Sequence, residues 1–240
     1  CQDTANGKIL CIKKEKTDAQ RAKVFTKIGK EMAVAIREGG PDPVSNSKLR
    51  DLIQKAKANN VPNDNIDRII KKFSGDNSIA YDEITYEGYG PCGVAVIVEA
   101  TTDNRNRTAS EVRHYFDKFG GNLGQNGCVS YLFETKGVIL IEQDGKIDED
   151  RLMESALEAG ASDFSAEDGC FEIYTEQSDL YAVKEALEAA GYTILSAESD
   201  RIPSTYVTLE NEEDIRHMQL LLDNLEDNDD VSEVYHNWDA

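Results

Sequence analysis

The sequence lacks any long apolar segment. Its apolar runs, such as Val94–Val98, have the length of a β-strand and fall far short of the roughly eighteen residues that a membrane-spanning helix needs. No charged-then-apolar leader of the signal-peptide type opens the chain. With 40% apolar and 30% charged residues, the composition is that of an ordinary globular protein. We therefore expect a cytoplasmic protein without a membrane partner.

Residue types that commonly hold metals or carry catalysis are scarce and scattered. The five cysteines form no CxxC pair, and His114, His217 and His236 lie far apart in the sequence. The GxSxG and HExxH signatures are absent. Gly120-Gly121 is not followed by the Lys-Ser/Thr of a phosphate-binding loop. We therefore predict that the chain is not an enzyme and has no catalytic residue, metal site, cofactor or small-molecule substrate.

Positive charge is rare overall but concentrated at one end. The chain has a net charge of −20, yet residues 1–77 contain sixteen Lys or Arg against ten Asp or Glu, a net of +6. The remaining 163 residues contain ten basic and thirty-six acidic side chains, a net of −26. Such asymmetry predicts a polyanion, such as a nucleic acid, as the partner of the basic segment. The acidic remainder is expected to repel the same polyanion and to restrict how it docks; the alternative is that it merely keeps the protein soluble.

The first seventy-seven residues have helical periodicity. Apolar residues recur at helical spacing from Val24 to Ile36, and Gly39-Gly40-Pro41 ends the run. A second helix is predicted around Leu49–Ala56 and a third around Ile66–Phe73. Each helix has one apolar stripe, so the three must bury these stripes against one another or against the rest of the protein. The segment is predicted to form a small basic helical domain.

From Tyr81 onward, short strands and helices alternate. The predicted strands are 82–87, 94–100, 128–133, 138–142, 170–175, 192–197, 206–209 and 231–236. The predicted helices are one with Val112–Phe119 on its core side, followed by 149–159, 179–190 and 212–225. The two strands after Pro203 are expected to complete the sheet that Val94–Ala100 begins, so the segment between is read as an insertion.

The sequence thus predicts an α+β protein in which an N-terminal three-helix domain precedes two split βαβ-type (ferredoxin-like) α/β domains. The predicted domains are the basic helical domain 1–77, a discontinuous middle domain 78–134 and 203–240, and an inserted acidic domain 135–202.

Six motifs occur together and in a fixed order. They are KKEKTDAQRAKVFTK at 13–27, AIREGG at 35–40, KAKANNVP at 55–62, EITYEGYGP at 83–91, TDNRNRT at 102–108 and GGNLG at 120–124. In these motifs the chain resembles the YebC family, from about Lys13 to its C-terminus. Residues 6–12 lack the His and Trp with which that family usually opens, so no role is assigned to any residue before Lys13.

The resemblance to the YebC family implies a three-domain cytoplasmic or organellar protein. The family includes bacterial proteins regarded as transcriptional regulators and a mitochondrial translational activator of cytochrome c oxidase. Its members are linked variously to DNA, messenger RNA and the ribosome. The resemblance therefore implies a regulator of gene expression and leaves its target open.

Cations of the first helix and its lead-in are the main candidates for phosphate contact, because several lie along the helix side opposite the apolar stripe. Cations near the end of the third helix extend this set. The candidates are Lys13, Lys14, Lys16, Arg21, Lys23, Lys27, Lys30, Arg68, Lys71 and Lys72. Each ammonium or guanidinium group that neutralises a phosphate releases a counterion, which favours binding. The alternative is an ordinary solvated helix surface, and the prediction fails where neighbouring carboxylates neutralise the cations.

Two further sets are candidates with open alternatives. Arg105 and Arg107 stand at a predicted helix start, where guanidinium and free amide groups can hold an anion together. The alternative is ion pairing, of Arg105 with Asp103 and of Arg107 with Glu111. Tyr86 and Tyr89 lie in or beside a glycine-bounded loop and are candidates for stacking on unpaired bases. More often such tyrosines pack a turn.

Three functional hypotheses follow. In the first, the protein is a probable transcriptional regulator that binds DNA through its basic helical domain. In the second, it binds messenger RNA or the ribosome and assists translation. In the third, its acidic sheets bind a protein partner as an adaptor. Sequence alone does not separate the first two.

Overall fold

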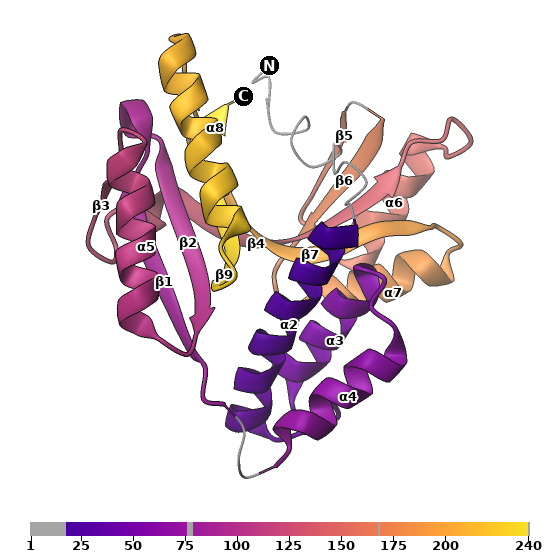
Figure 1. The fold of residues 1–240 in the computed structure, drawn as a ribbon. Coiled ribbons are helices and arrows are strands. Elements are labelled where there is room, and N and C mark those ends of the chain that lie inside the picture. Colours follow the sequence, from indigo (N-terminus) through magenta and orange to yellow (C-terminus); the bar gives the residue numbers. More distant parts are fainter. Residues whose placement is uncertain (1–17, 76–78, 168, 240) are drawn as a thin grey trace. The chain divides into compact units, whose positions relative to one another are not determined.

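The computed structural model describes the backbone of residues 18–75, 79–167 and 169–239, together with their side chains apart from those of residues 18–21 and 167. The described chain divides into two compact units, one of residues 133–202 and one of residues 18–132 with 203–239 (Figure 1). Among the described helices, none has the length and apolar character to cross a membrane. Each unit is considered separately below.

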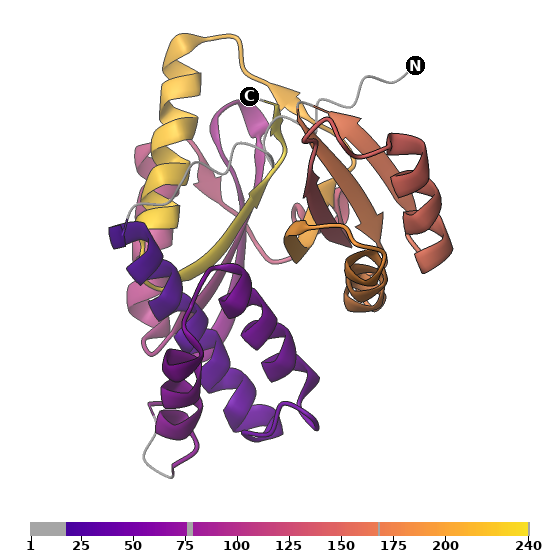
Figure 2. The same cartoon turned by 90° about the vertical axis from the view of Figure 1, so that its right-hand side faces the viewer.

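The three helices predicted for the N-terminal segment are confirmed as α2 (Asp18–Gly39), α3 (Ser47–Ala58) and α4 (Asn63–Phe73). Their apolar stripes meet in a core that includes Ile28, Met32, Leu49, Leu52, Ile66 and Ile69. Figure 2 shows α2 running alongside the shorter α3 and α4.

Asn46 fixes the corner between α2 and α3. Its side-chain oxygen accepts the Leu49 N–H at 3.0 Å, which caps α3, while its amide donates to the carbonyls of Ala35 and Gly40. One buried side chain thus satisfies backbone groups at the end of one helix and the start of the next.

The larger unit also contains an antiparallel sheet with the order β3-β1-β2-β9. Its strands are β1 (Asp82–Tyr89), β2 (Ala95–Thr102), β3 (Asn122–Leu123) and β9 (Val231–His236). Two helices, α5 (Arg105–Lys118) and α8 (Glu212–Asp227), bury Phe116 and Met218 against Val96 and Val98 of β2. The predicted pairing of β2 with the C-terminal strand is confirmed.

Helix α2 packs beside the same sheet, where it contacts β1, β2 and β9. Successive residues of a strand point to opposite faces. Ile97 of β2 therefore points away from Val96 and Val98, and it is fully buried as well. Ala33 and Val34 of α2 are also buried, although they lie outside the three-helix core. The side of α2 that turns away from its own core is therefore covered.

Two glycine-rich motifs of the sequence meet at the edge of this sheet. A Cβ atom on Gly121 would lie 2.2 Å from the Tyr89 carbonyl oxygen, and one on Gly88 would lie 2.7 Å from the Asn122 carbonyl oxygen. The glycines allow the two backbones to approach closely. Close packing of the two segments therefore requires glycine at these two positions.

The smaller unit has the element order βαββαβ and a sheet with the order β5-β6-β4-β7. Its elements are β4 (Phe133–Glu142), α6 (Glu149–Ala159), β5 (Asp163–Glu167), β6 (Cys170–Thr175), α7 (Leu180–Ala189) and β7 (Ile194–Pro203). Leu152, Val183 and Leu187 of the two helices pack against Ile139 and Phe171 of the sheet. This is the ferredoxin-like arrangement expected from the sequence, with β5 as a strand that the sequence analysis did not predict.

The strand predicted at 128–133 is wrong. A turn and the short 3-10 helix η2 (Ser130–Leu132) precede β4, which begins at Phe133. Gly127 has a φ of +91°, and its N–H donates to the buried carboxylate of Glu87, while the Tyr89 hydroxyl donates to the Cys128 carbonyl. These contacts hold the segment as a loop against β1.

The strand predicted at 206–209 does not join the main sheet of the larger unit. It is the short β8 (Val207–Thr208), which pairs in parallel with β10 (Trp238–Asp239). Just before it, the Ser204 N–H donates to the Leu132 carbonyl at 2.8 Å. The chain therefore leaves and re-enters the larger unit at adjacent points.

Candidate nucleic-acid interface

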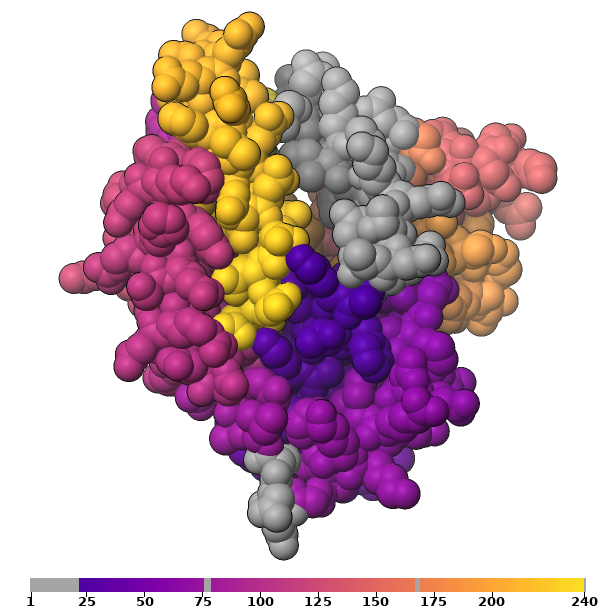
Figure 3. Space-filling view, viewed as in Figure 1, coloured from indigo at the N-terminus to yellow at the C-terminus, as the bar shows by residue number. Residues whose placement is uncertain are grey.

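The lysines of α2 lie on the predicted side of the helix, but that side is not open. Lys23, Lys27 and Lys30 are spaced by four and three residues, opposite the apolar stripe. They meet residues 226–230, which form the C-terminal end of α8 and the turn that follows. Figures 1 and 2 both show this end of α8 beside α2, and in Figure 3 the yellow C-terminal atoms touch the indigo atoms of α2.

Each of the three lysines has a named acceptor at this end of α8. Lys23 Nζ forms a salt bridge with the Asp227 carboxylate, Lys27 Nζ donates to the Glu226 carbonyl at 2.5 Å, and Lys30 Nζ donates to the Asp229 carbonyl at 2.9 Å and to the Asp230 carboxylate at 2.8 Å. A helix C-terminus presents unsatisfied carbonyl groups and partial negative charge, so cations stabilise it. The prediction of phosphate contact requires that neighbouring carboxylates leave these cations free. On α2 that requirement is not met.

The charge environment of these lysines reflects the same contacts. The hydrogen bond from Lys23 to Asp227 raises the pKa of Lys23 and lowers the pKa of Asp227. Burial lowers the pKa of Lys27, and the carboxylates of Glu233 and Glu226 oppose that effect. The cations of α2 are therefore balanced by charges within the protein.

Asp230 is the centre of this ion-pair network. Its carboxylate is almost fully buried and accepts hydrogen bonds from Lys30 Nζ at 2.8 Å, Arg107 Nη2 at 2.7 Å and Thr108 Oγ1 at 3.0 Å. Burial is the largest single influence and raises the pKa of Asp230, but the hydrogen bonds from Lys30, Arg107 and Thr108 and the positive charge of Lys30 together outweigh it and lower the pKa to about 2. Asp230 thus connects α2, α5 and the start of β9.

Both arginines at the start of α5 are paired, though not with the partners considered from the sequence. Arg105 Nε donates to Asp82 at 3.1 Å instead of pairing with Asp103. Arg107 pairs with Asp103 at 2.9 Å as well as with Asp230, and these bonds raise its pKa. The side chain of Asn104 caps the helix by accepting the Arg107 N–H. Carboxylates of the protein therefore occupy the guanidinium groups that were candidates for an external anion.

Helix α3 is attached to the sheet by two lysines that the sequence analysis did not single out. Lys48 Nζ lies 2.8 Å from Glu83 of β1, and Lys55 Nζ lies 2.9 Å from Glu233 of β9. Lys48 and Lys55 are seven residues apart and so share one side of the helix. Part of the positive charge of the helical segment is thus paired with carboxylates of the sheet.

The opposite sides of α3 and α4 carry cations that remain exposed. Arg68, Lys71 and Lys72 of α4 lie opposite its buried residues, and Arg50 and Lys57 of α3 lie opposite Lys48 and Lys55. Within the described part of the chain, none of these five outer cations forms a salt bridge. Arg50 and Lys57 were not among the candidates predicted from the sequence, although their seven-residue spacing places them on one helix side.

Acidic residues near the outer cations include two aspartates of α4. Asp64 and Asp67 stand one turn before Arg68 and Lys71, on the same side of α4, although no salt bridge forms between them. Lys72 Nζ lies 5.1 Å from the centre of the Phe73 ring, a cation–π contact that leaves its charge in place. The end of α4 thus carries three exposed cations that form no salt bridge among the described residues.

The two candidate tyrosines contribute to packing. Tyr86 lies partly buried against the core of the larger unit, and burial raises its pKa. The Tyr89 hydroxyl donates to the Cys128 carbonyl at 3.0 Å. Tyr86 therefore packs against the core beside β1, and Tyr89 holds the loop that contains Cys128; stacking of either ring on a base stays a prediction. Tyr131 of η2 is 73% exposed. No periodic pattern in the sequence indicated that this aromatic residue is exposed.

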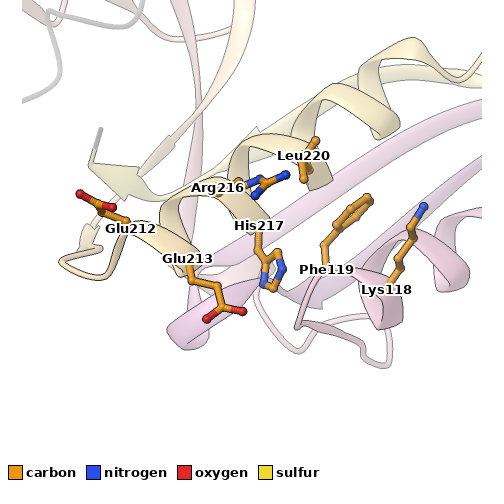
Figure 4. A pocket seen from close by; sticks show the side chains of 7 residues that line it. All are labelled: Lys118, Phe119, Glu212, Glu213, Arg216, His217 and Leu220. Atoms are coloured by element: carbon orange, nitrogen blue, oxygen red, sulfur yellow. The ribbon is translucent and has the colours of Figure 1, made fainter.

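A cavity of about 580 Å³ lies between the end of α5 and the first half of α8 (Figure 4). Glu212 and Glu213 stand at one end of it, and Lys118 and Arg216 supply positive charge. Such mixed charge does not favour a phosphate chain. Among the described residues, no group of three or more His, Cys, Asp or Glu is placed to hold a metal ion.

Part of the candidate set cannot be placed. Lys13, Lys14 and Lys16 lie outside the described residues, and so does the side chain of Arg21. Their assignment stays a prediction.

Comparison with known proteins gives consistent matches along most of the chain. Residues 11–76 match a family model described as the TACO1/YebC protein N-terminal domain, and residues 81–238 match one described as the TACO1/YebC second and third domain. A protein of Acetivibrio thermocellus named "Probable transcriptional regulatory protein" is 60% identical over 227 residues, which cover 94% of each chain. A protein of Caldicellulosiruptor bescii with the same name is 58% identical over 228 residues, covering 95% of this chain and 93% of its own. The crystal structure of a conserved hypothetical protein from Aquifex aeolicus is similar with a TM-score of 0.81 and 48% identity, covering 93% of this chain and 92% of the other.

Proposed function

Because this chain belongs to the TACO1/YebC family, we propose that it is a nucleic-acid-binding regulator of gene expression, acting in the cytoplasm without catalysis of its own. Relatives that share more than half of its residues carry the name of probable transcriptional regulatory proteins, which favours DNA as the target. We further propose the domain division 1–77, 78–134 with 203–240, and 135–202.

The observation that carries the proposal is the exposed basic end of α4. Arg68, Lys71 and Lys72 lie opposite the buried residues of α4 and form no salt bridge among the described residues, on a chain whose residues after 77 carry a net charge of −26. A phosphate chain that approaches this particle is attracted at the helical end and repelled elsewhere. Binding of this kind depends on backbone charge and shape, so it tolerates many sequences.

Replacing Arg68, Lys71 and Lys72 together with glutamine is expected to weaken binding about equally on all nucleic-acid sequences. If all three contact phosphates, the slope of log K against log salt concentration flattens by up to about 2.7 on duplex DNA, or about 2.1 on single strands. Fluorescence anisotropy over a series of salt concentrations measures both effects.

The matched control removes three exposed cations from other elements, Arg113 and Lys118 of α5 and Arg216 of α8. It changes the net charge by the same amount, so its slope should stay close to that of the unmodified protein. Equal slopes for the two triple variants would show that α4 makes no specific phosphate contact.

The class of target is resolved by crosslinking in cells followed by sequencing of the attached nucleic acid. Promoter DNA would support regulation of transcription. Ribosomal or messenger RNA would support the alternative, a ribosome- or mRNA-associated translation factor. Recovery of neither, together with a basic protein partner, would favour the acidic adaptor.

A further inference from the structure

We propose that residues 226–230 act as an internal competitor for the nucleic acid: they hold the α2 lysines in the free protein and release them when a phosphate chain binds. We call the contact between Lys23, Lys27, Lys30 and residues 226–230 the α2–α8 latch. The inference rests on the proposed function, because it assumes that phosphates reach the helical end of the molecule.

The end of α8 offers the kind of acceptor that a nucleic-acid backbone offers. Within five residues it presents the carboxylates of Glu226, Asp227, Asp229 and Asp230 and the carbonyl oxygens of a helix C-terminus. Three lysines in successive turns of α2 contact this row of oxygens. A phosphate chain supplies a similar row of anionic oxygens, so the two compete for the same ammonium groups.

The latch is graded from its outer to its inner end. At the outer end, the side chains of Lys23 and Asp227 are 39% and 75% exposed, so water and salt screen their pairing. At the inner end, the side chains of Lys30 and Asp230 are 14% and 6% exposed. An incoming phosphate therefore contacts Lys23 first. Release of Lys30 from Asp230 is the last step and costs the most free energy.

The graded contact predicts how binding responds to a weakened latch. Where a ligand must first displace an internal partner, its apparent affinity equals its intrinsic affinity multiplied by the fraction of molecules that are open. Removing the negative charge of Asp227 raises that fraction. Because an exposed ion pair contributes modestly, the expected gain in affinity is about two- to fivefold.

The test compares Asp227→Asn with Asp223→Asn in the full chain. Asp223 lies one turn earlier on α8, is exposed and takes no part in the latch, so its replacement changes the net charge equally. The probes are a DNA duplex of arbitrary sequence and an RNA hairpin. On the probe that the unmodified protein binds, Asp227→Asn should bind about two- to fivefold more tightly than Asp223→Asn. Adding Lys23→Gln should abolish the gain.

Hydrogen exchange gives an independent readout. Amides of residues 226–231 should exchange faster in the complex than in the free protein, because the lysines have left the end of α8. Exchange that stays unchanged in a complex that depends on the α4 cations would overturn the latch.

The outcomes separate the two proposals. If the unmodified protein binds through α4 but Asp227→Asn and Asp223→Asn have equal affinity, the latch is wrong and the proposed function stands. If the unmodified protein binds neither probe, both the proposed function and the latch are wrong.

Discussion

Replacing Asp230 with alanine is expected to lower the free energy of unfolding by about 3 kcal/mol at neutral pH. The change removes the one carboxylate that Lys30, Arg107 and Thr108 share. Arg107 keeps Asp103 as a partner, but the largely buried ammonium of Lys30 loses its only carboxylate among the described residues. Unfolding in urea, followed by circular dichroism, measures the loss. Asp223→Ala, a change of the same kind on the exposed side of α8, should cost little.

The contribution of Asp230 should also disappear in acid. Its pKa is about 2 in the folded protein and close to 4 in an unfolded chain. A group with a lowered folded pKa stabilises the protein above its unfolded pKa and loses that effect as the pH falls through the folded value. The difference in stability between the unmodified protein and Asp230→Asn should therefore shrink between about pH 4 and pH 2. A difference that stays constant over that window would contradict the ion-pair network.

His236 is expected to make the protein lose up to about 3 kcal/mol of stability between about pH 6.5 and pH 4. Burial in β9 lowers its pKa from 6.5 to about 4, and its Nδ1 accepts the Trp238 N–H at 3.2 Å, which requires that nitrogen to be unprotonated. As the pH falls below 6.5, the unfolded chain takes up the proton before the folded one does. Unfolding therefore becomes more favourable until the folded state is protonated as well.

The measurement is urea unfolding at closely spaced pH values from 7 to about 4. His236→Gln keeps an acceptor for the Trp238 N–H and removes the titrating group. Its stability should vary less with pH over this window, while carboxylates contribute equally to both proteins. Parallel curves for the two proteins would show that His236 is not the cause.

Much of the fold follows from local patterns. The three N-terminal helices and most strands of both sheets have strong periodicity, and they occur where it predicts them. The misses are short or polar elements. Strand β5, Asp163–Glu167, mixes acidic and small residues and is a strand because β6 pairs with it. The segment before β4 is a loop because contacts with Glu87 and Tyr89 hold it, and these residues are about forty positions away.

The candidate site shows which property the sequence did not predict, namely whether the lysine side of α2 is exposed. Spacing correctly placed Lys23, Lys27 and Lys30 on the side of α2 opposite its apolar stripe. It could not reveal that the same side meets α8, because Lys30 and Asp230 are 200 residues apart in the chain. An amphipathic pattern shows which side of a helix is polar. Whether solvent or another part of the protein faces that side depends on tertiary contacts.

The hydrogen bond from Ser204 to Leu132 has a consequence for how this protein can vary. Since the two junctions of the βαββαβ unit touch, a few residues suffice to bridge them. The larger unit, which contains α2 and α8, therefore does not depend on which segment is inserted at that point. Evolution can lengthen or replace the βαββαβ unit, or change its surface residues, while the cationic helices keep their positions within the larger unit.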